Sequence, residues 1–210
     1  MNKQGLALQT STGDLGLAFV DCQGKFYCNY WDLGRELADR LQEILAGFVK
    51  EVTSWNKLDF LAVSLGPGSY TSTRIGVVTA RILAQQLNLP VVGISNTELL
   101  AWEEAKRQQK QAVIAVEMPA SNGEVYGAIY RRNNEYLLLE EVEKCRAMMP
   151  KKWQEISEEY KQRYPEGIVA VKSPPKLGYT AKYLLEISQL KIDALLEKTT
   201  YNWKNLLPLY

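Results

Sequence analysis

Residues 60–94 constrain the fold of this chain more than any other segment. An apolar stretch, Phe60–Leu65, ends in the sequence GPGS and leads into a helical pattern over Thr71–Leu87. A second apolar stretch, Pro90–Ile94, follows directly. A strand, a helix and a second strand joined in this way predict a βαβ unit with parallel strands. The glycine-rich turn then lies at the carboxyl end of a strand, where α/β proteins commonly place their binding sites.

The composition excludes several classes of function. A net charge of +1 over 210 residues provides no overall field for binding nucleic acid or a membrane surface. The sequence has no histidine, so it lacks the commonest general base, and no His-based zinc site is expected. Its three cysteines are not arranged as Cys-x-x-Cys, and its first residues form no continuous apolar run. We therefore expect a cytoplasmic protein with no membrane span, no metal site and no cofactor.

The first half of the chain predicts one α/β lobe. The strands are expected at Leu6–Gln9, Leu15–Asp21 and Phe26–Trp31, and the short breaks between them favour an antiparallel meander. Apolar residues recur along one face of Leu33–Thr53, which is therefore expected to be an amphipathic helix before the βαβ unit. A further helix is expected at Asn96–Gln109. This order of elements matches the half-domain of the actin, sugar kinase and Hsp70 group.

The second half of the chain predicts a companion lobe. A polar run at Glu103–Gln111 is the best candidate boundary, so we expect lobes at residues 1–110 and 111–210. Each lobe should contain a mixed sheet flanked by helices. The expected elements are strands at Ala112–Glu117, Glu124–Arg131, Tyr136–Leu139 and Ile168–Val171, and helices at Met149–Tyr164 and Thr180–Leu190.

Two turns at predicted strand ends are candidates for binding an anion or a nucleotide. Their residues are Thr10, Ser11, Thr12, Gly66, Gly68 and Ser69. The second turn lacks the lysine of a Walker loop, and Thr71 stands where the third glycine of G-x-G-x-x-G would be. The alternative is a sharp strand-to-helix turn in which Ser69 or Thr71 caps the helix. Gln9 closes the first strand where a metal-dependent ATPase needs a carboxylate, so ATP hydrolysis is not expected.

The helix that follows the second turn carries a stripe of small residues. Ser72, Gly76, Ala80 and Ala84 recur every four residues and share one face of the helix. A smooth face of this kind lets another backbone approach closely. The approaching element could belong to this chain or to another subunit, and the spacing alone favours internal packing. Arg74 opposes the helix dipole, which makes it a candidate contact for an acidic partner or an anion.

Several segments resemble the TsaB (YeaZ) family. They are SLGPGSYTSTRIG at residues 64–76, NLPVVGISNTELLA at 88–101, LALQTST at 6–12, NGEVYGAIY at 122–130 and PLY at 208–210. The resemblance implies an actin-like two-lobed fold and a noncatalytic subunit of the machinery that installs threonylcarbamoyladenosine in tRNA. It implies that the chain pairs with a TsaD-like subunit and acts together with a TsaE-like ATPase. Contact with tRNA is then expected only through the complex.

The resemblance also implies a contact surface on the helices Leu33–Thr53 and Thr71–Leu87, and this makes the small-residue stripe an intersubunit face. The same face would form a homodimer when the protein is alone, and Gly76→Leu would weaken association while leaving the fold soluble. The chain departs from the family pattern at Gln9, Ser72 and Glu117. The expected interface residues are Leu37, Leu41, Ser72, Arg74, Ile75, Gly76, Thr79, Ala80, Leu83 and Ala84.

Two other classes of function remain open at this point. The first is an actin-fold ATPase or sugar-kinase-like enzyme that binds phosphate at the two turns. The second is a module that binds tRNA directly, because lysine, arginine and tyrosine are mixed in residues 151–164 and 172–183. Acidic residues interrupt the first of these segments, which argues against a continuous basic surface.

Overall fold

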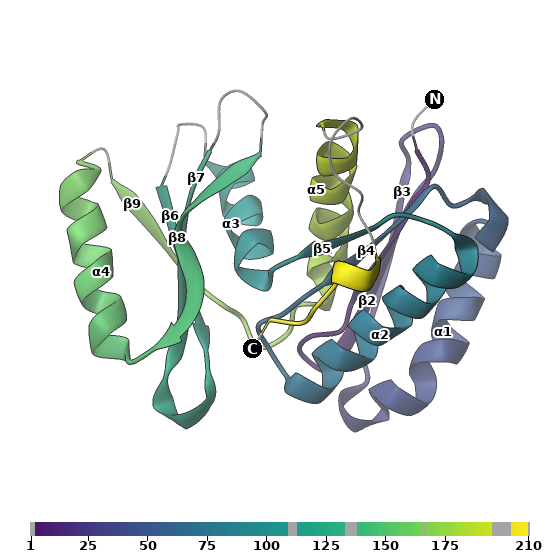
Figure 1. The fold of residues 1–210 in the computed structure, drawn as a ribbon, viewed down its shortest axis with the longest axis horizontal. Coiled ribbons are helices and arrows are strands. Elements are labelled where there is room, and N and C mark those ends of the chain that lie inside the picture. The colour runs from purple at the N-terminus through teal and green to yellow at the C-terminus, as the bar shows by residue number, and fades with distance from the viewer. Residues whose placement is uncertain (1–2, 109–112, 133–137, 166, 195–202, 210) are drawn as a thin grey trace. The chain divides into compact units, whose positions relative to one another are not determined.

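The computed structural model divides the chain into two compact units (Figure 1). It describes all residues except 1–2, 109–112, 133–137, 166, 195–202 and 210. The first unit combines residues 1–95 with residues 175–210, and the second unit comprises residues 96–174. This division differs from the expected lobes at 1–110 and 111–210, because the chain returns to the first unit after completing the second.

The first unit is built on a five-stranded mixed sheet in the order β3-β2-β1-β4-β5. β1, β2 and β3 are antiparallel neighbours, whereas β4 runs parallel to both β1 and β5. The predicted meander and the predicted βαβ unit are both confirmed. The strands are β1 Gly5–Gln9, β2 Asp14–Val20, β3 Phe26–Asp32, β4 Phe60–Ser64 and β5 Val91–Ile94.

Helices cover both faces of this sheet (Figure 1). α1 (Leu37–Val52) and α2 (Tyr70–Leu87) pack on one face, and α5 (Ala181–Ala194) packs against β1 and β2 on the other. Ser69 caps α2, because its side chain accepts a hydrogen bond from the backbone of Ser72, as predicted. None of the helices in the described part of the chain has the length and apolar content needed to span a membrane.

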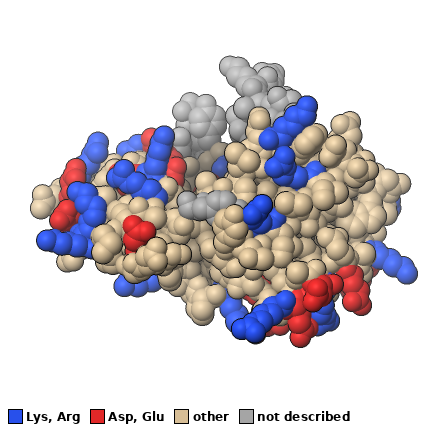
Figure 2. Space-filling view, turned by 60° about the horizontal axis from the view of Figure 1, so that its bottom comes forward, with Lys and Arg blue, Asp and Glu red and all other residues tan. Residues whose placement is uncertain are grey.

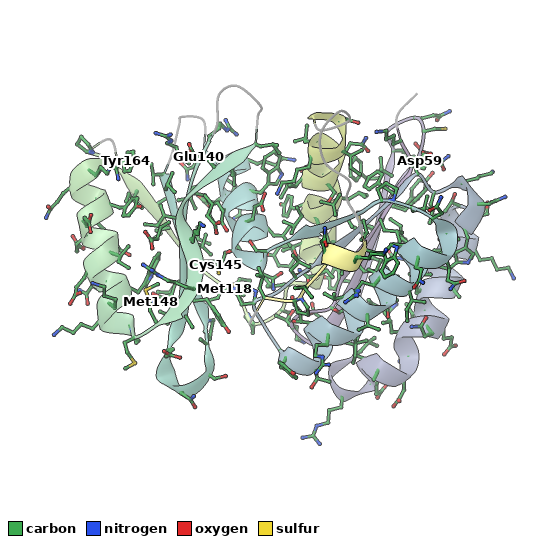
Figure 3. The ribbon with its side chains drawn as sticks, in the orientation of Figure 1. Asp59, Met118, Glu140, Cys145, Met148 and Tyr164 are labelled. Atoms are coloured by element: carbon green, nitrogen blue, oxygen red, sulfur yellow. The ribbon has the colours of Figure 1, made fainter. Side chains whose placement is uncertain are left out.

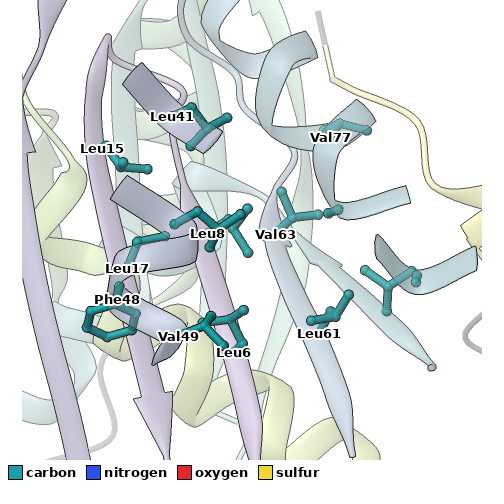
Figure 4. Close-up of a cluster of buried hydrophobic side chains, with 14 of the residues drawn as sticks. Leu6, Leu8, Leu15, Leu17, Leu41, Phe48, Val49, Leu61, Val63 and Val77 are labelled. Carbon is teal, nitrogen blue, oxygen red and sulfur yellow. The ribbon is translucent and has the colours of Figure 1, made fainter. Parts of the chain in front are cut away.

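The main core lies between the sheet and the helices α1 and α2 (Figure 4). Alternate strand residues such as Leu6, Leu8, Leu61 and Val63 are fully buried there, as expected when one face of a strand is covered. The opposite face carries small residues. A Cβ atom at Gly16 would lie 1.9 Å from the carbonyl oxygen of Gly178, so the segment before α5 can reach the sheet only because this position is glycine.

The second unit contains a four-stranded mixed sheet in the order β8-β7-β6-β9. Its core includes Trp153, which lies so close to Gly127 that a Cβ atom there would clash with the indole ring. Met118 lies on β6, and Cys145 and Met148 lie on β8, so these labelled residues mark the two strands that flank β7 (Figure 3). The elements are α3 Asn96–Arg107, β6 Val113–Pro119, β7 Val125–Arg132, β8 Leu139–Met148, α4 Pro150–Arg163 and β9 Ile168–Lys172.

The third strand of this unit differs from the expectation. A strand was expected at Tyr136–Leu139, of which residues 136–137 lie outside the described part of the chain. β8 begins at Leu139 and continues to Met148 through the sequence LEEVEKCRAM. Its many charged residues hide the alternating pattern of a half-buried strand, and β8 tolerates them because it lies at the edge of the sheet.

Candidate functional site

The two turns that are candidates for binding an anion lie against each other. The backbone N–H of Ser69 donates to the carbonyl oxygen of Ser11 over 2.7 Å. A Cβ atom at Gly68 would lie only 2.3 Å from the same oxygen, so this close approach requires glycine. The structure thus brings the two candidate turns into direct contact.

Several donors of these turns already form hydrogen bonds within the protein. The backbone N–H and hydroxyl of Ser11 donate to Oε1 of Gln9 over 3.1 and 2.7 Å, and the N–H of Gly66 donates to Oγ of Ser64 over 3.3 Å. A phosphate group would need these donors to be directed at the ligand. The contacts favour the structural interpretation of the turns over an anion cradle.

The two threonines of the first turn are also engaged. Oγ1 of Thr10 donates to the carbonyl oxygen of Ser72 over 2.9 Å, which ties the turn to the first turn of α2. Oγ1 of Thr12 donates to Asp14 and accepts from the N–H of Leu177. Hydrogen bonds thus connect the first turn both to α2 and to the segment that leads into α5.

Gln9 connects two distant parts of the first unit. Its side chain is fully buried, and Nε2 donates to Oγ1 of Thr180, at the start of α5, over 3.0 Å. Its Oε1 accepts both hydrogen bonds from Ser11. A buried amide with these partners acts as a neutral link between β1 and α5. Among the described residues, no group of three or more His, Cys, Asp or Glu side chains could hold a metal ion.

The small-residue stripe of α2 faces the chain's own first unit. A Cβ atom at Gly76 would lie 2.2 Å from Oγ1 of Thr10, and Ala80 and Ala84 are fully buried. Internal packing, which the spacing alone favours, is therefore confirmed. The assignment of these residues to an intersubunit face is corrected, because the sheet and its loops already occupy the smooth face.

The other expected interface residues also lie mostly inside the unit. Leu37, Leu41 and Thr79 are buried. Ser72, Ile75 and Leu83 are half-buried, and the last two pack on the main core. Among the ten expected interface residues, only Arg74 is exposed.

The exposed face of α2 carries a second row of residues four apart, which we call the outer row: Tyr70, Arg74, Val78 and Ile82. Tyr70, Val78 and Ile82 are 57%, 48% and 53% exposed, which is high for large apolar side chains. Nη1 of Arg74 donates to the hydroxyl of Tyr70 over 2.8 Å, and its guanidinium lies 5.2 Å from the centre of that ring. The same four-residue period that identifies the buried stripe could have identified this row.

A hollow of about 410 Å³ lies elsewhere in the first unit and was not predicted from the sequence. Nζ of Lys176 pairs with the carboxylate of Asp32 there, and this hydrogen bond raises the pKa of Lys176. Oδ2 of Asp14 accepts from the N–H of Gly178 over 2.5 Å. The hollow thus contains the Lys176–Asp32 ion pair and the carboxylate of Asp14, which accepts a hydrogen bond from a backbone N–H. It is lined by Asp14, Tyr30, Asp32, Lys176 and Tyr179.

The basic segments considered for direct tRNA binding are interrupted by acidic partners. Lys152 pairs with Glu155, Lys161 with Glu158, and Lys172 with Glu117. On the face shown in Figure 2, lysine and arginine side chains are separated by acidic and uncharged surface. This pattern lacks the continuous basic stripe that typically binds a nucleic acid backbone.

Comparisons with known proteins identify relatives of this chain. A family described as "TsaD: tRNA N6-adenosine threonylcarbamoyltransferase" matches residues 33–203. A Buchnera aphidicola (subsp. Schizaphis graminum) protein named "tRNA threonylcarbamoyladenosine biosynthesis protein TsaB" is 40% identical over 80 residues, which cover 38% of each chain. A Bacillus subtilis protein of the same name is 36% identical over 102 residues, covering 49% of this chain and 42% of that protein. The chain thus spans about two fifths of the length of these curated relatives.

A solved structure described as "YeaZ from Pseudomonas aeruginosa" superimposes on the chain with a TM-score of 0.76. The superposition covers 99% of both chains, with 23% sequence identity. At this level of identity the likeness shows a common fold. It confirms the expected α/β, actin-like architecture of two mixed sheets flanked by helices.

Proposed function

This chain belongs to the TsaB/YeaZ family of tRNA threonylcarbamoyladenosine biosynthesis proteins, and from that premise we propose that it is a noncatalytic subunit that pairs with a TsaD-like protein. The outer row of α2 is the observation that carries this proposal. Such a subunit works in the cytoplasm, where its partner acts on tRNA together with a TsaE-like ATPase. The chain itself contacts tRNA only through the complex.

The outer row has the character of a protein interface. Tyrosine and arginine are enriched among the residues that contribute most of the binding energy at protein interfaces, and here a hydrogen bond joins the two side chains. Residues four apart form a ridge that packs into the groove of a partner helix. Val78 and Ile82 extend this ridge with exposed apolar surface, which is stabilised when a partner removes it from water.

Two features support a noncatalytic role. Gln9 occupies the position where a metal-dependent ATPase of this fold needs a carboxylate, and its amide is used to link β1 to the segment before α5. In the two candidate phosphate turns, the N–H of Ser69 donates to the carbonyl oxygen of Ser11, and the N–H of Ser11 donates to Gln9, so these donors already have acceptors within the protein. We infer that this unit supports the active site of its partner by binding to it.

The test is association with the TsaD-like protein of the same organism. The two proteins are co-expressed, and complex formation is measured by size exclusion with multi-angle light scattering and by titration calorimetry. We expect a one-to-one complex. Ile82→Asp should weaken it at least about tenfold, because an ionised carboxylate loses much of its hydration when it is buried in an apolar interface.

Met149→Asp is the matched control for this experiment. Met149 is 59% exposed and lies in the second unit, so it is as accessible as Ile82 but belongs to a different surface. The control variant should bind with unchanged affinity. Equal affinity of the Ile82→Asp variant and the original chain would overturn the assignment of the outer row, and absence of any complex would overturn the proposed pairing.

A further inference from the structure

Residues 203–209, the last segment that the structure describes, lie against the β4–α2 turn and beside α2 itself (Figure 1). We call this segment the strap. Trp203–Asn205 form a short 3₁₀ helix that contacts α2, and Trp203 packs on the main core. Leu206 is part of that core and is only 6% exposed. The strap thus docks on the side of the sheet that carries α2, although α5, the described element before it, covers the opposite face.

The strap also bonds to the backbone of the residue that follows β4. The N–H of Leu65 donates to the carbonyl oxygen of Ile94 over 2.9 Å, which continues the pairing of β4 with β5. The carbonyl oxygen of Leu65 accepts from the N–H of Leu209 over 2.7 Å. The strap therefore satisfies a backbone group that the sheet itself leaves for another partner.

Two glycines make room for the strap. A Cβ atom at Gly93 would lie 2.8 Å from Cδ1 of Leu206, and a Cβ atom at Gly66 would lie 3.0 Å from the carbonyl oxygen of Leu209. Gly66 also has a φ of +87°, a conformation that favours glycine. The groove under the strap is thus formed by the same turn that leads to Ser69, the cap of α2.

The docking contact is small and has the chemistry of a peptide ligand. One leucine is buried, one tryptophan is partly buried, and one backbone hydrogen bond is formed. Apolar anchors combined with a main-chain hydrogen bond are the means by which proteins recognise extended peptides. The remaining large or polar side chains of the strap are exposed: Lys204, Asn205, Leu207 and Leu209.

We propose that the strap is a built-in peptide ligand, and that its docking holds the β4–α2 turn in the conformation from which α2 presents its outer row. The strap contacts Leu65 and Gly66, the turn continues to the cap at Ser69, and the 3₁₀ helix contacts α2 directly. The groove recognises an extended apolar peptide with a leucine anchor. The part concerning the outer row rests on the proposed function, whereas the peptide groove does not.

Peptide binding to the full chain tests the groove. Leu206→Asp should release the strap, because a carboxylate is costly to bury in the core, and thereby free the groove. Leu207→Asp is the matched control, since the neighbouring leucine is 63% exposed and its substitution should leave the strap docked. A fluorescent peptide with the sequence of residues 203–209, blocked at both ends, is titrated into each chain, and its anisotropy is measured.

The Leu206→Asp chain should bind this peptide at least about tenfold more tightly than the original chain and the Leu207→Asp chain, whose own straps compete at high effective concentration. A peptide carrying Leu206→Ala should bind at least about tenfold more weakly than the original peptide, because it lacks the buried anchor. Equal binding to the three chains, or no binding to a Leu206→Asp chain with the circular dichroism of the original, would overturn the proposal.

Amide exchange with a milder pair of variants tests the effect on α2, and it decides the matter if Leu206→Asp fails to fold. The N–H groups of Ser69, Ser72 and Thr73 all donate at the start of this helix. Leu206→Ala should speed their exchange at least about tenfold while the β1–β2 ladder exchanges as before. Leu207→Ala should change neither. Uniform acceleration throughout the first unit would show that Leu206 only stabilises the core, which would overturn the proposal.

Calorimetry with the TsaD-like protein separates this inference from the proposed function. The Leu206→Asp chain should bind that protein at least about fivefold more weakly than the original chain, because the pairing conformation is less populated, and saturating peptide should restore the affinity. Unchanged affinity would overturn the role of the strap in pairing while the proposed function stands. If the original chain forms no complex, the proposed function fails, and peptide binding and exchange still decide whether the strap is a ligand.

Discussion

At the scale of single residues, two helical glycines have opposite surroundings. Gly76 faces Thr10 so closely that a Cβ atom would clash with its hydroxyl. Gly47, in α1, has no atom within 4 Å of the position that a Cβ would take. Gly76 therefore permits close packing of α2 on the first turn, whereas Gly47 only lowers the helix propensity of α1 by about 1 kcal/mol relative to alanine.

We expect alanine substitutions at these positions to change stability in opposite directions. Gly76→Ala should lower the free energy of unfolding by about 1–3 kcal/mol, because the added methyl group overpacks the contact with Thr10. Gly47→Ala should raise it by about 1 kcal/mol. Urea unfolding followed by circular dichroism measures both changes. A stabilising effect at Gly76 would contradict the observed contact, and the same contact implies that Gly76→Leu damages the fold itself.

At the scale of elements, α2 combines packing on the core with defined contacts at both of its ends. Ser69 caps its first turn, and Thr10 bonds to the carbonyl oxygen of Ser72. At the other end Asn88 adopts the left-handed conformation, with φ 52°, that commonly terminates a helix. The helix is thereby held with its small residues inward and its outer row exposed.

The cap can be tested by two substitutions at one position. Ser69→Ala should lower the free energy of unfolding by about 1 kcal/mol, because the N–H of Ser72 loses its acceptor. Ser69→Asp should retain the stability, since a carboxylate also accepts this hydrogen bond and favours the positive end of the helix. Thermal unfolding measures both variants. Equal losses in the two chains would show that the hydroxyl does not act as a cap.

At the scale of the whole molecule, the first unit is assembled from both ends of the chain. α5 belongs to the last part of the sequence, yet Leu184, Leu185 and Ile187 are fully buried and the helix packs against β1 and β2. Gln9 is linked to Thr180, and Asp14 to Gly178, in the segment before this helix. The first 95 residues alone leave one face of the sheet uncovered.

This arrangement predicts the outcome of dissecting the chain. A protein in which residues 1–95 are joined to 175–210 by a flexible glycine-serine linker should fold cooperatively. Residues 1–110 alone should aggregate, because the apolar face that α5 covers is exposed to water. Light scattering and amide exchange distinguish the two outcomes. Cooperative folding of residues 1–110 would show that α5 is dispensable for the first unit.

Much of the local structure of the first unit follows from short-range patterns. The meander, the βαβ unit and the cap at Ser69 were all predictable, because strand alternation, helical periodicity and turn residues act within a few positions. β8 escaped prediction because an edge strand can carry charges on most of its length. The strand at Ile168–Lys172 was found, since its apolar run is compact.

The candidate site was less predictable. The two rows of α2 have the same four-residue spacing, and the family resemblance assigned the partner to the row of small residues. The structure exposes the other row. Which row faces inward depends on how closely the loop at Thr10 and the sheet approach α2. This distance is not encoded in the sequence of the helix itself.

The family, the class of fold and most helices and strands could be read from the amino-acid sequence, because they depend on local periodicity, on turn chemistry and on motifs that lie within one segment. Three features became visible only in the folded chain: α5 completes the first unit, the two turns bond to each other, and Tyr70, Val78 and Ile82 face outward. These properties depend on contacts between residues far apart in the chain, whose distances are set by the packing of the whole unit.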